Sequence, residues 1–220
     1  MKKMTRVIVT FLTILILASC TIEQKPSSDI ITPAEKFQLW NGIDFTGWKL
    51  YIPDETVDVN SVWTIVDGVI HCTGIPSGYI RTEKNYTNYK LSLEWRWPAE
   101  PGNSGVLLHM SEPDKIWPKS IEAQLKSGNA GDFWLIDGTE INEHVDKSSR
   151  RVARPNESSE KPPGEWNTYE IACSENIIRV RINGIEQNVS TGTSVQMGKI
   201  CLQSEGKPVQ FRNIYLEPVQ

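Results

Sequence analysis

Apolar and polar residues alternate from Phe37 onward, and no stretch carries an apolar stripe with the period of a helix. Two hairpins are predicted because a turn dipeptide joins two alternating runs. Asp67-Gly68 joins 63–66 to 69–72, and Asn183-Gly184 joins 177–182 to 185–189. Further strands are expected at 79–82, 89–97, 105–110, 120–126, 133–136, 168–173, 199–203 and 209–217. So many short strands between turn residues predict an all-β sandwich of two antiparallel sheets in one domain.

One segment, 139–164, breaks this pattern. It is polar, contains Arg150, Arg151 and Arg154, and ends in Lys-Pro-Pro-Gly. A connection of this length in a compact domain is usually a functional loop or is disordered. We expect a loop folded over one rim of the sandwich. The arginines are expected to be solvated, with a clamp for an acidic sugar as the alternative.

The first residues have the organisation of a targeting signal. Basic residues precede an uncharged run at 7–18 that is too short to span a bilayer. The run ends Leu-Ala-Ser-Cys at Cys20, which resembles the lipobox of bacterial lipoproteins. We therefore expect a signal peptide at 1–19, lipidation of Cys20, a polar tether at 20–35 and a folded domain at 36–220. The expected location is the cell envelope, periplasmic or at the cell surface, with the lipid anchor as the only membrane contact.

Composition narrows the function classes. With 23 basic and 27 acidic residues the net charge is −4, so the chain lacks the basic field that nucleic-acid binding requires. A dedicated three-histidine zinc site would use all 3 histidines. Cys72, Cys173 and Cys201 form no Cys-x-x-Cys pair, and we expect buried free thiols, with one disulfide as the alternative.

The chain has eight tryptophans, and some of them lie near the polar faces of predicted strands. Carboxylates and amides hydrogen-bond sugar hydroxyls, and indole rings stack on the apolar faces of pyranoses. The candidate residues on these faces, with two nearby tryptophans, are Glu94, Arg96, His109, Glu122, Gln124, Lys126, Gln203, Glu205, Trp117 and Trp134. Together they favour a concave sugar-binding sheet over the alternative of solvated outer faces.

Five segments in order resemble the 3-keto-disaccharide hydrolase domain family. The first is 39–48, Leu-Trp-Asn-Gly-Ile-Asp-Phe-Thr-Gly-Trp. The others are 63–68, 102–105, 163–167 and 211–214, so that the resemblance spans about 37–218. It implies a concanavalin A-like jelly roll of two antiparallel sheets. It also suggests a hydrolase that acts on 3-keto-glycosides, with a carbohydrate as the partner.

Jelly-roll glucanases carry Glu-x-Asp-x-Glu on a concave strand, but 122–126 reads Glu-Ala-Gln-Leu-Lys. Only the first carboxylate is present, at Glu122. Retaining hydrolysis needs two carboxyl groups about 5–5.5 Å apart. This strand does not supply both, so the standard retaining reaction is disfavoured.

A 3-keto sugar changes the requirement, because the ketone acidifies the proton on C2. The reaction then needs only three groups: one base, one acid for the leaving oxygen, and a positive group near the developing enolate. We expect Glu122 or His109 as base or acid, with Arg96, Lys126 or a bound divalent cation beside the enolate. Glu94, Gln124 and Gln203 would position hydroxyl groups. No other cofactor is implied.

Two other functions fit the same residues. One is a carbohydrate-binding, lectin-like lipoprotein without catalysis, and the other is a structural lipoprotein of the cell envelope. The fold alone does not separate them, because jelly rolls host both binding and catalysis.

Overall fold

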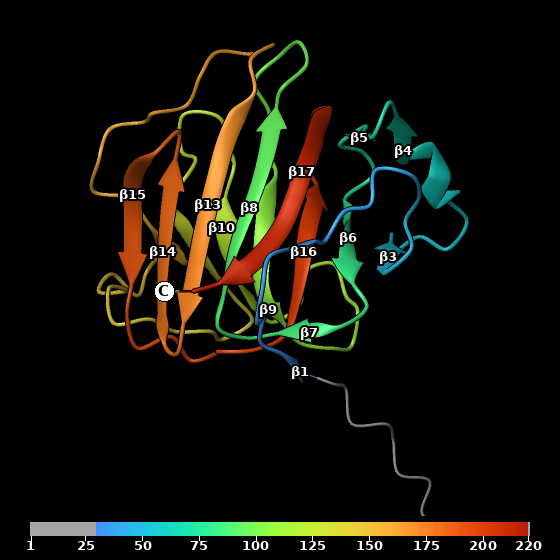
Figure 1. The fold of residues 1–220 in the computed structure, drawn as a ribbon. Coiled ribbons are helices and arrows are strands. Elements are labelled where there is room, and N and C mark those ends of the chain that lie inside the picture. The colour runs from blue at the N-terminus through green and yellow to red at the C-terminus, as the bar shows by residue number, and fades with distance from the viewer. Residues whose placement is uncertain (1–29, 220) are drawn as a thin grey trace, which may run out of the picture.

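The computed structural model describes residues 30–219, whose strands form two large sheets packed face to face (Figure 1). The seven-stranded sheet has the order β12-β11-β10-β9-β16-β6-β3. The eight-stranded sheet has the order β15-β14-β13-β8-β17-β5-β4, with β2 paired to β17. All pairs within these two sheets are antiparallel, so the predicted all-β sandwich is confirmed.

The seven-stranded sheet is built from β3 (Trp48–Tyr51), β6 (Gly78–Thr82), β9 (Gly105–Met110), β10 (Ser120–Gln124), β11 (Phe133–Ile136), β12 (Arg151–Val152) and β16 (Lys199–Ser204). The eight-stranded sheet is built from β2 (Phe37–Gln38), β4 (Trp63–Val66), β5 (Val69–Cys72), β8 (Tyr89–Arg96), β13 (Asn167–Ser174), β14 (Ile177–Ile182), β15 (Ile185–Ser190) and β17 (Val209–Pro218). A short 3-10 helix, η1 (Val59–Ser61), precedes β4. Two short strands, β1 (Ile30–Ile31) and β7 (Asn85–Tyr86), form a separate parallel pair.

Both predicted hairpins are present at the expected residues. Asp67 and Gly68 have φ of 50° and 76°, and Asn183 and Gly184 have φ of 52° and 80°. Two consecutive positive φ values define the turn that matches the twist of paired strands, and Asp-Gly and Asn-Gly adopt them at low cost. The turns therefore fix the register of β4 with β5 and of β14 with β15.

The hydrophobic core lies between the two sheets, and alternation fills it from both sides. Along β8, Tyr89, Leu91, Leu93 and Trp95 point inward and are no more than 1% exposed. Along β10, Ile121 and Ala123 meet them from the other sheet. The opposite side chains of β8 and β10 therefore lie on two different outer faces of the sandwich, which decides where the candidate polar residues fall.

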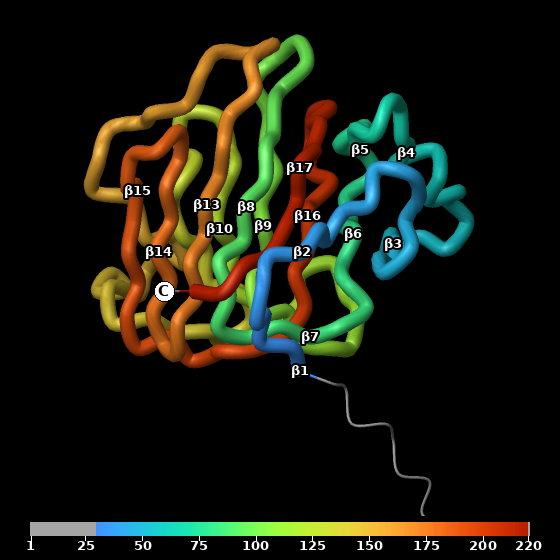
Figure 2. Tube along the Cα trace, in the orientation of Figure 1, coloured from blue at the N-terminus to red at the C-terminus, as the bar shows by residue number. Residues whose placement is uncertain are grey.

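The long connection from β11 to β13 follows one edge of the sandwich (Figure 2). It adds β12 to the seven-stranded sheet, and then Asn156 and Ser159 donate hydrogen bonds to backbone carbonyls near the β14–β15 hairpin. Buried Asp132 anchors the connection by accepting from Arg151 Nε at 2.6 Å and from the Arg154 backbone at 2.9 Å. The expectation of a loop folded over one rim is confirmed, and two of its three arginines are held at Asp132.

The expected signal peptide, Cys20 and most of the expected tether lie outside the described residues. At Ile30 the chain already pairs with β7. Within the described part of the chain, no helix is long and apolar enough to cross a membrane. Cys72, Cys173 and Cys201 are buried and unbridged, as predicted.

Candidate functional site

A pocket of about 190 Å³ hollows the outer face of the seven-stranded sheet. Its floor and walls come from β10, β11, the 111–119 connection, the long 137–166 connection and the segments flanking β9 and β16. The lining residues are Asn103, Trp117, Glu122, Gln124, Lys126, Trp134, Ile136, Arg150 and Glu205. Six of the sequence-predicted site residues are thus brought together: Trp117, Glu122, Gln124, Lys126, Trp134 and Glu205.

Strand β10 supplies the centre of the pocket. Glu122 lies opposite Leu107 of β9 and Trp134 of β11, and directly paired residues project from the same face of a sheet. Its neighbours Ile121 and Ala123 point into the core on the other side. The predicted separation of faces along 120–126 is therefore confirmed, and Glu122 is only 5% exposed.

Gly105 makes the room that the Glu122 side chain occupies. β9 lies between β10 and β16, so a side chain at this position would stand between Glu122 and Gln203. A Cβ atom there would collide with Glu122 Oε1 and come within 2.6 Å of Gln203 Oε1. The absence of a Cβ lets a carboxyl group from β10 and an amide from β16 approach each other across the intervening strand.

Several polar atoms around this point are buried without a hydrogen-bond partner among the described residues. They are Asn103 Oδ1, Glu122 Oε1 and both amide atoms of Gln203. A buried polar atom without a partner costs about 1–3 kcal/mol, so native structures keep few of them. Other such atoms are spread through the molecule, but these four belong to Asn103 and Glu122, which line the pocket, and to the adjacent Gln203. Such atoms offer hydrogen bonds to a polar ligand.

The two carboxyl groups of the pocket have different electrostatic environments. Burial is the main cause that raises the pKa of Glu122 to about 8, and the nearby Glu205 carboxylate adds to the rise. Arg150 and the adjacent Gln203 amide oppose it in part. Burial also raises the pKa of Glu205, against the effects of Asn103 and Lys126. At neutral pH, Glu122 therefore holds a proton.

Positive charge reaches the pocket from Lys126 and Arg150. The Arg150 guanidinium lies 5.8 Å from the centre of the Trp134 ring, within the range of a cation–π contact. Its neighbour Arg151 is held at Asp132, which fixes this part of the long connection against the sheet. Arg150 is exposed, as expected of the arginine cluster, and it also lines the pocket.

The structure moves His109 away from the pocket. Its φ is +56°, and the register between β9 and β16 shifts beside it, so alternation breaks between Leu107 and Met110. The imidazole is 1% exposed, with Nδ1 3.1 Å from the Val195 carbonyl and its ring against Tyr89. Burial lowers the pKa of His109 to about 4. The expectation that His109 lies on the sugar-binding face with Glu122 is wrong, and a buried neutral imidazole is in no position to exchange a proton with a ligand there.

Glu94 and Arg96 also lie elsewhere. β8 belongs to the eight-stranded sheet, so its polar side chains project from the opposite outer face of the molecule. Glu94 accepts a hydrogen bond from Arg212 Nε at 2.6 Å. Arg96 binds Gln210 and stacks on Trp166. Their assignment to a sugar-binding face together with Glu122 is therefore wrong.

Gln203 lies where it was expected, on the pocket face of β16 beside Glu122. Gln124 lines the pocket, but its Oε1 accepts from the backbone of Leu125 and Lys126. Gln124 therefore also holds the backbone where β10 ends. No group of three or more His, Cys, Asp or Glu side chains in residues 30–219 is arranged to hold a metal ion.

Two polar residues of the pocket, Asn103 and Arg150, were not among the candidates from the sequence. Asn103 had no assigned role, and Arg150 had only the alternative role of a clamp for an acidic sugar. Asn103 stands in the Gly-Asn-Ser-Gly segment at 102–105. That segment pairs with residues 205 and 206 after β16, which places its amide beside Glu205. The available signal was a polar residue two positions before a strand that begins with a buried glycine.

Comparison with known proteins agrees with this architecture. Residues 36–217 match the model of the 3-keto-alpha-glucoside-1,2-lyase-like domain. No curated protein matches the chain.

Solved structures share the fold at low identity. A candidate glycosyl hydrolase from Parabacteroides distasonis ATCC 8503 is 24% identical over 84% of this chain and 94% of that chain, with a TM-score of 0.63. Carbohydrate-binding module CBM66 from Bacillus subtilis is 8% identical over 79% of this chain and 97% of that chain, with a TM-score of 0.58. The β-glucanase of Bacillus licheniformis is 12% identical over 84% and 99%, with a TM-score of 0.55. The jelly-roll class predicted from the sequence is confirmed.

Proposed function

Because the chain belongs to the family of 3-keto-alpha-glucoside-1,2-lyase-like domains, we propose that it cleaves 3-keto-glycosides in the pocket around Glu122 by elimination followed by hydration. Membership supports a glycoside-processing function in general, and the chemistry of the pocket supports the finer statement. The observation that carries it is a buried carboxyl group, Glu122, whose pKa burial raises to about 8, in one pocket with a second carboxyl group and the cationic Arg150.

In the proposed elimination, Glu205 takes the proton from C2 of the 3-keto ring. The electron pair moves onto O3 as an enolate, which the positive charge of Arg150 or Lys126 stabilises. The enolate then re-forms the ketone and expels the group on C1, while Glu122 donates its proton to the glycosidic oxygen. The products are an alcohol and an unsaturated 3-keto sugar with a C1–C2 double bond.

In the hydration, the two carboxyl groups exchange roles. Glu122, now a carboxylate, takes a proton from water as its oxygen bonds to C1. Glu205 returns a proton to C2, so that both groups regain their starting states. The net reaction is hydrolysis, and Asn103 and Gln203 offer their unpartnered amide atoms to the ring hydroxyls.

Reaction in D₂O tests this proposal. Elimination and hydration place solvent deuterium on C2 of the product, and mass spectrometry of the product at early times detects it. A reaction without enzyme corrects for spontaneous exchange beside the ketone. Cleavage without deuterium at C2 contradicts the proposal, and binding of the substrate without turnover favours a carbohydrate-binding protein.

Glu205 supports a second candidate, direct hydrolysis of unmodified glycosides. β10 has only one of the two carboxylates that this reaction requires, but the segment after β16 brings a second one into the same pocket. One would act as acid and the other as base or nucleophile. Turnover of unmodified glycosides, with no deuterium on C2, would support this candidate over elimination.

We also infer, from the lipobox-like segment alone, that the protein is carried on a membrane of the cell envelope by a lipid on Cys20. Cell fractionation of Cys20→Ser tests this. The variant should leave the membrane fraction, and unchanged membrane association would contradict the anchor.

A further inference from the structure

The segment 111–119, which joins β9 to β10, carries Trp117 to the pocket, and we call it the strap. Its base is closed by a hydrogen bond from the Ser111 backbone N–H to the Lys119 carbonyl at 3.0 Å. Between these two residues the strap reaches far from its own strands. Asp114 contacts side chains of β6 and β3, and β16 lies between those strands and β9.

The register of the sheet shows what the strap covers. Directly paired residues form a row across five strands: Lys49 on β3, Arg81 on β6, Cys201 on β16, Leu107 on β9 and Glu122 on β10. A sugar chain lying across the strands with one unit at Glu122 would follow this row. Asp114 sits over the Lys49–Arg81 end of it.

Burial along the row from Leu107 to Arg81 agrees with a strap that fills this part of the face, whereas Lys49 at the β3 end is 54% exposed. On the strap side of β10, the apolar side chains Tyr79, Leu107, Met110 and Cys201 belong to a cluster separate from the core between the sheets. The cluster also includes Ile136 of β11, on the other side of β10. Each is at most 4% exposed, although all belong to an outer sheet face. A sugar chain therefore has no room over β16 and β6 on this side of Glu122.

Asp114 fastens the strap in this position. Arg81 holds it in a two-point contact, with Nε to Oδ1 at 2.7 Å and Nη2 to Oδ2 at 3.0 Å. Lys49 Nζ and the Tyr79 hydroxyl donate to the same carboxylate at 2.8 and 3.0 Å. Burial alone would raise the pKa of Asp114, but these donors outweigh it and hold the pKa well below its usual range. Asp114 is therefore ionised over the physiological pH range, and its contact with Arg81 is an ion pair.

We propose that the strap, fastened by Asp114 to Arg81, limits the protein to the terminal sugar unit of a glycan, so that Asp114 is a specificity-determining residue although it does not line the pocket. This inference rests on the proposed function for its reaction, but its geometry concerns glycan length alone. The pocket volume of about 190 Å³ agrees with it, since pockets that bury drug-sized ligands measure about 300–1,000 Å³. The rest of the glycan must leave the pocket toward solvent on the side away from the strap.

The test compares wild-type protein with Asp114→Asn and with the double variant R81Q/D114N. The double variant removes both charges of the buried Arg81–Asp114 pair together, which guards against unfolding of the single variant. Lys49 and Glu112 lose a partner, but their side chains are 54% and 51% exposed. Glu100→Gln is the matched control, because it neutralises an exposed carboxylate whose partner is Lys207, away from the strap. Thermal unfolding establishes that each protein is folded.

The first readout is turnover of glycans with a 3-keto unit at the chain end or inside the chain. In wild-type protein and Glu100→Gln, kcat/KM should be about 100-fold higher for the terminal unit than for the internal unit. In the strap variants this ratio should be at least about tenfold smaller. The loss should come from faster reaction of the internal unit. Equal rates on both glycans in the wild type would overturn the strap proposal while leaving the proposed function intact.

The second readout does not depend on turnover. Tryptophan fluorescence measures binding of unmodified oligosaccharides of two to six units, with Trp117 and Trp134 as reporters. Wild-type affinity should stop rising after the shortest ligands, and affinity in the strap variants should continue to rise with length. If no 3-keto-glycoside reacts but this length dependence holds, the proposed function fails and the strap proposal stands. Affinity that rises with each unit in the wild type, or no binding by any protein, overturns the strap proposal.

Discussion

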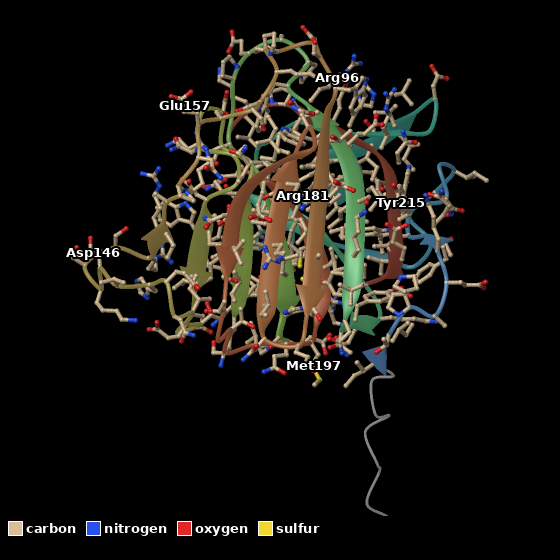
Figure 3. All side chains as sticks on the ribbon, turned by 60° about the vertical axis from the view of Figure 1, so that its left-hand side comes forward. Arg96, Asp146, Glu157, Arg181, Met197 and Tyr215 are labelled. Atoms are coloured by element: carbon tan, nitrogen blue, oxygen red, sulfur yellow. The ribbon has the colours of Figure 1, made fainter. Side chains whose placement is uncertain are left out.

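The two outer faces of the sandwich differ in how their charged groups are satisfied. The eight-stranded sheet carries the larger hollow, about 450 Å³, lined by Lys90, Glu170, Arg181 and Glu217 among others. Figure 3 shows Arg181 in the middle of this face. Within it, Lys90 bridges Glu170 at 2.8 Å and Glu217 at 3.0 Å. The pocket of the seven-stranded sheet is smaller, yet it holds buried polar atoms without partners.

Pocket volume therefore does not identify the candidate functional site in this molecule. On the eight-stranded face, charges lie in water and neutralise one another, and such pairs contribute about 0–1 kcal/mol each. On the seven-stranded face, the sheet holds Glu122, Gln203 and Asn103 out of water before any ligand arrives. That arrangement costs stability and persists where the groups serve a ligand.

The substitution expected to have the largest effect is Glu122→Gln. It is nearly isosteric and removes the proton that the proposed acid donates, so turnover should fall by about 10²–10⁴-fold. Ligand affinity should change far less, because glutamine still hydrogen-bonds hydroxyl groups. Steady-state kinetics and fluorescence titration on the same preparation check both statements, and wild-type turnover would remove Glu122 from the mechanism.

Gly105→Ala tests the space between Glu122 and Gln203. The added Cβ would displace the Glu122 carboxyl group, and a displacement of about 1 Å can cost 10²-fold in rate. Gly184→Ala is a suitable control, since its Cβ meets no atom within 4 Å and its positive φ affects only stability. Retained turnover in Gly105→Ala, with a crystal structure showing Glu122 in place, would contradict this account.

The pH dependence of stability should report the burial of Glu122. In the folded protein its pKa is about 8, whereas the ordinary value is 4.5. Between these values the unfolded chain releases the proton and the folded protein keeps it. The contribution of Glu122 to stability is therefore complete below about pH 4.5 and is lost as pH rises through about 8. Thermal unfolding from pH 4 to 9 should show this loss, and Glu122→Gln should reduce the slope in that window.

The smallest effect is expected on the other face. Glu94→Gln removes the ion pair with Arg212, whose side chains are 24% and 37% exposed. Stability should change by less than about 1 kcal/mol, and turnover should be unchanged. Chemical denaturation and kinetics measure the two quantities. A loss of turnover comparable to that in Glu122→Gln would erase the distinction between the two faces.

The sequence predicted the strands and both hairpins because alternation and positive-φ turn dipeptides are local signals. Alternation also predicted correctly that Glu122 and Gln124 share a face. It did not reveal which outer face a polar row would occupy, because that depends on the sheet to which each strand belongs. Glu94 and Glu122 therefore seemed equivalent, and only the long-range strand order separates them.

Two other features of the site could not be predicted from the local sequence pattern. The positive φ of His109 inverts the faces of the last residues of β9, and histidine itself gives no warning of this conformation. The second carboxyl group, Glu205, was selected as a sugar ligand, but its place in one pocket with Glu122 depends on β16 pairing beside β9. Both facts come from contacts between residues distant in the chain.

The closure of the strap at Ser111 and Lys119 has an evolutionary consequence. Because a backbone hydrogen bond joins its two ends, the strap can change in length or sequence without moving the strands on either side. Insertions or deletions within it would alter neither the strand order nor the position of Glu122, and loop length carries only a small entropic cost. Under the proposed roles of the strap and of Glu122 and Glu205, changes confined to the nine consecutive residues 111–119 would shift the preference from chain ends to chain interiors and leave both carboxyl groups in place.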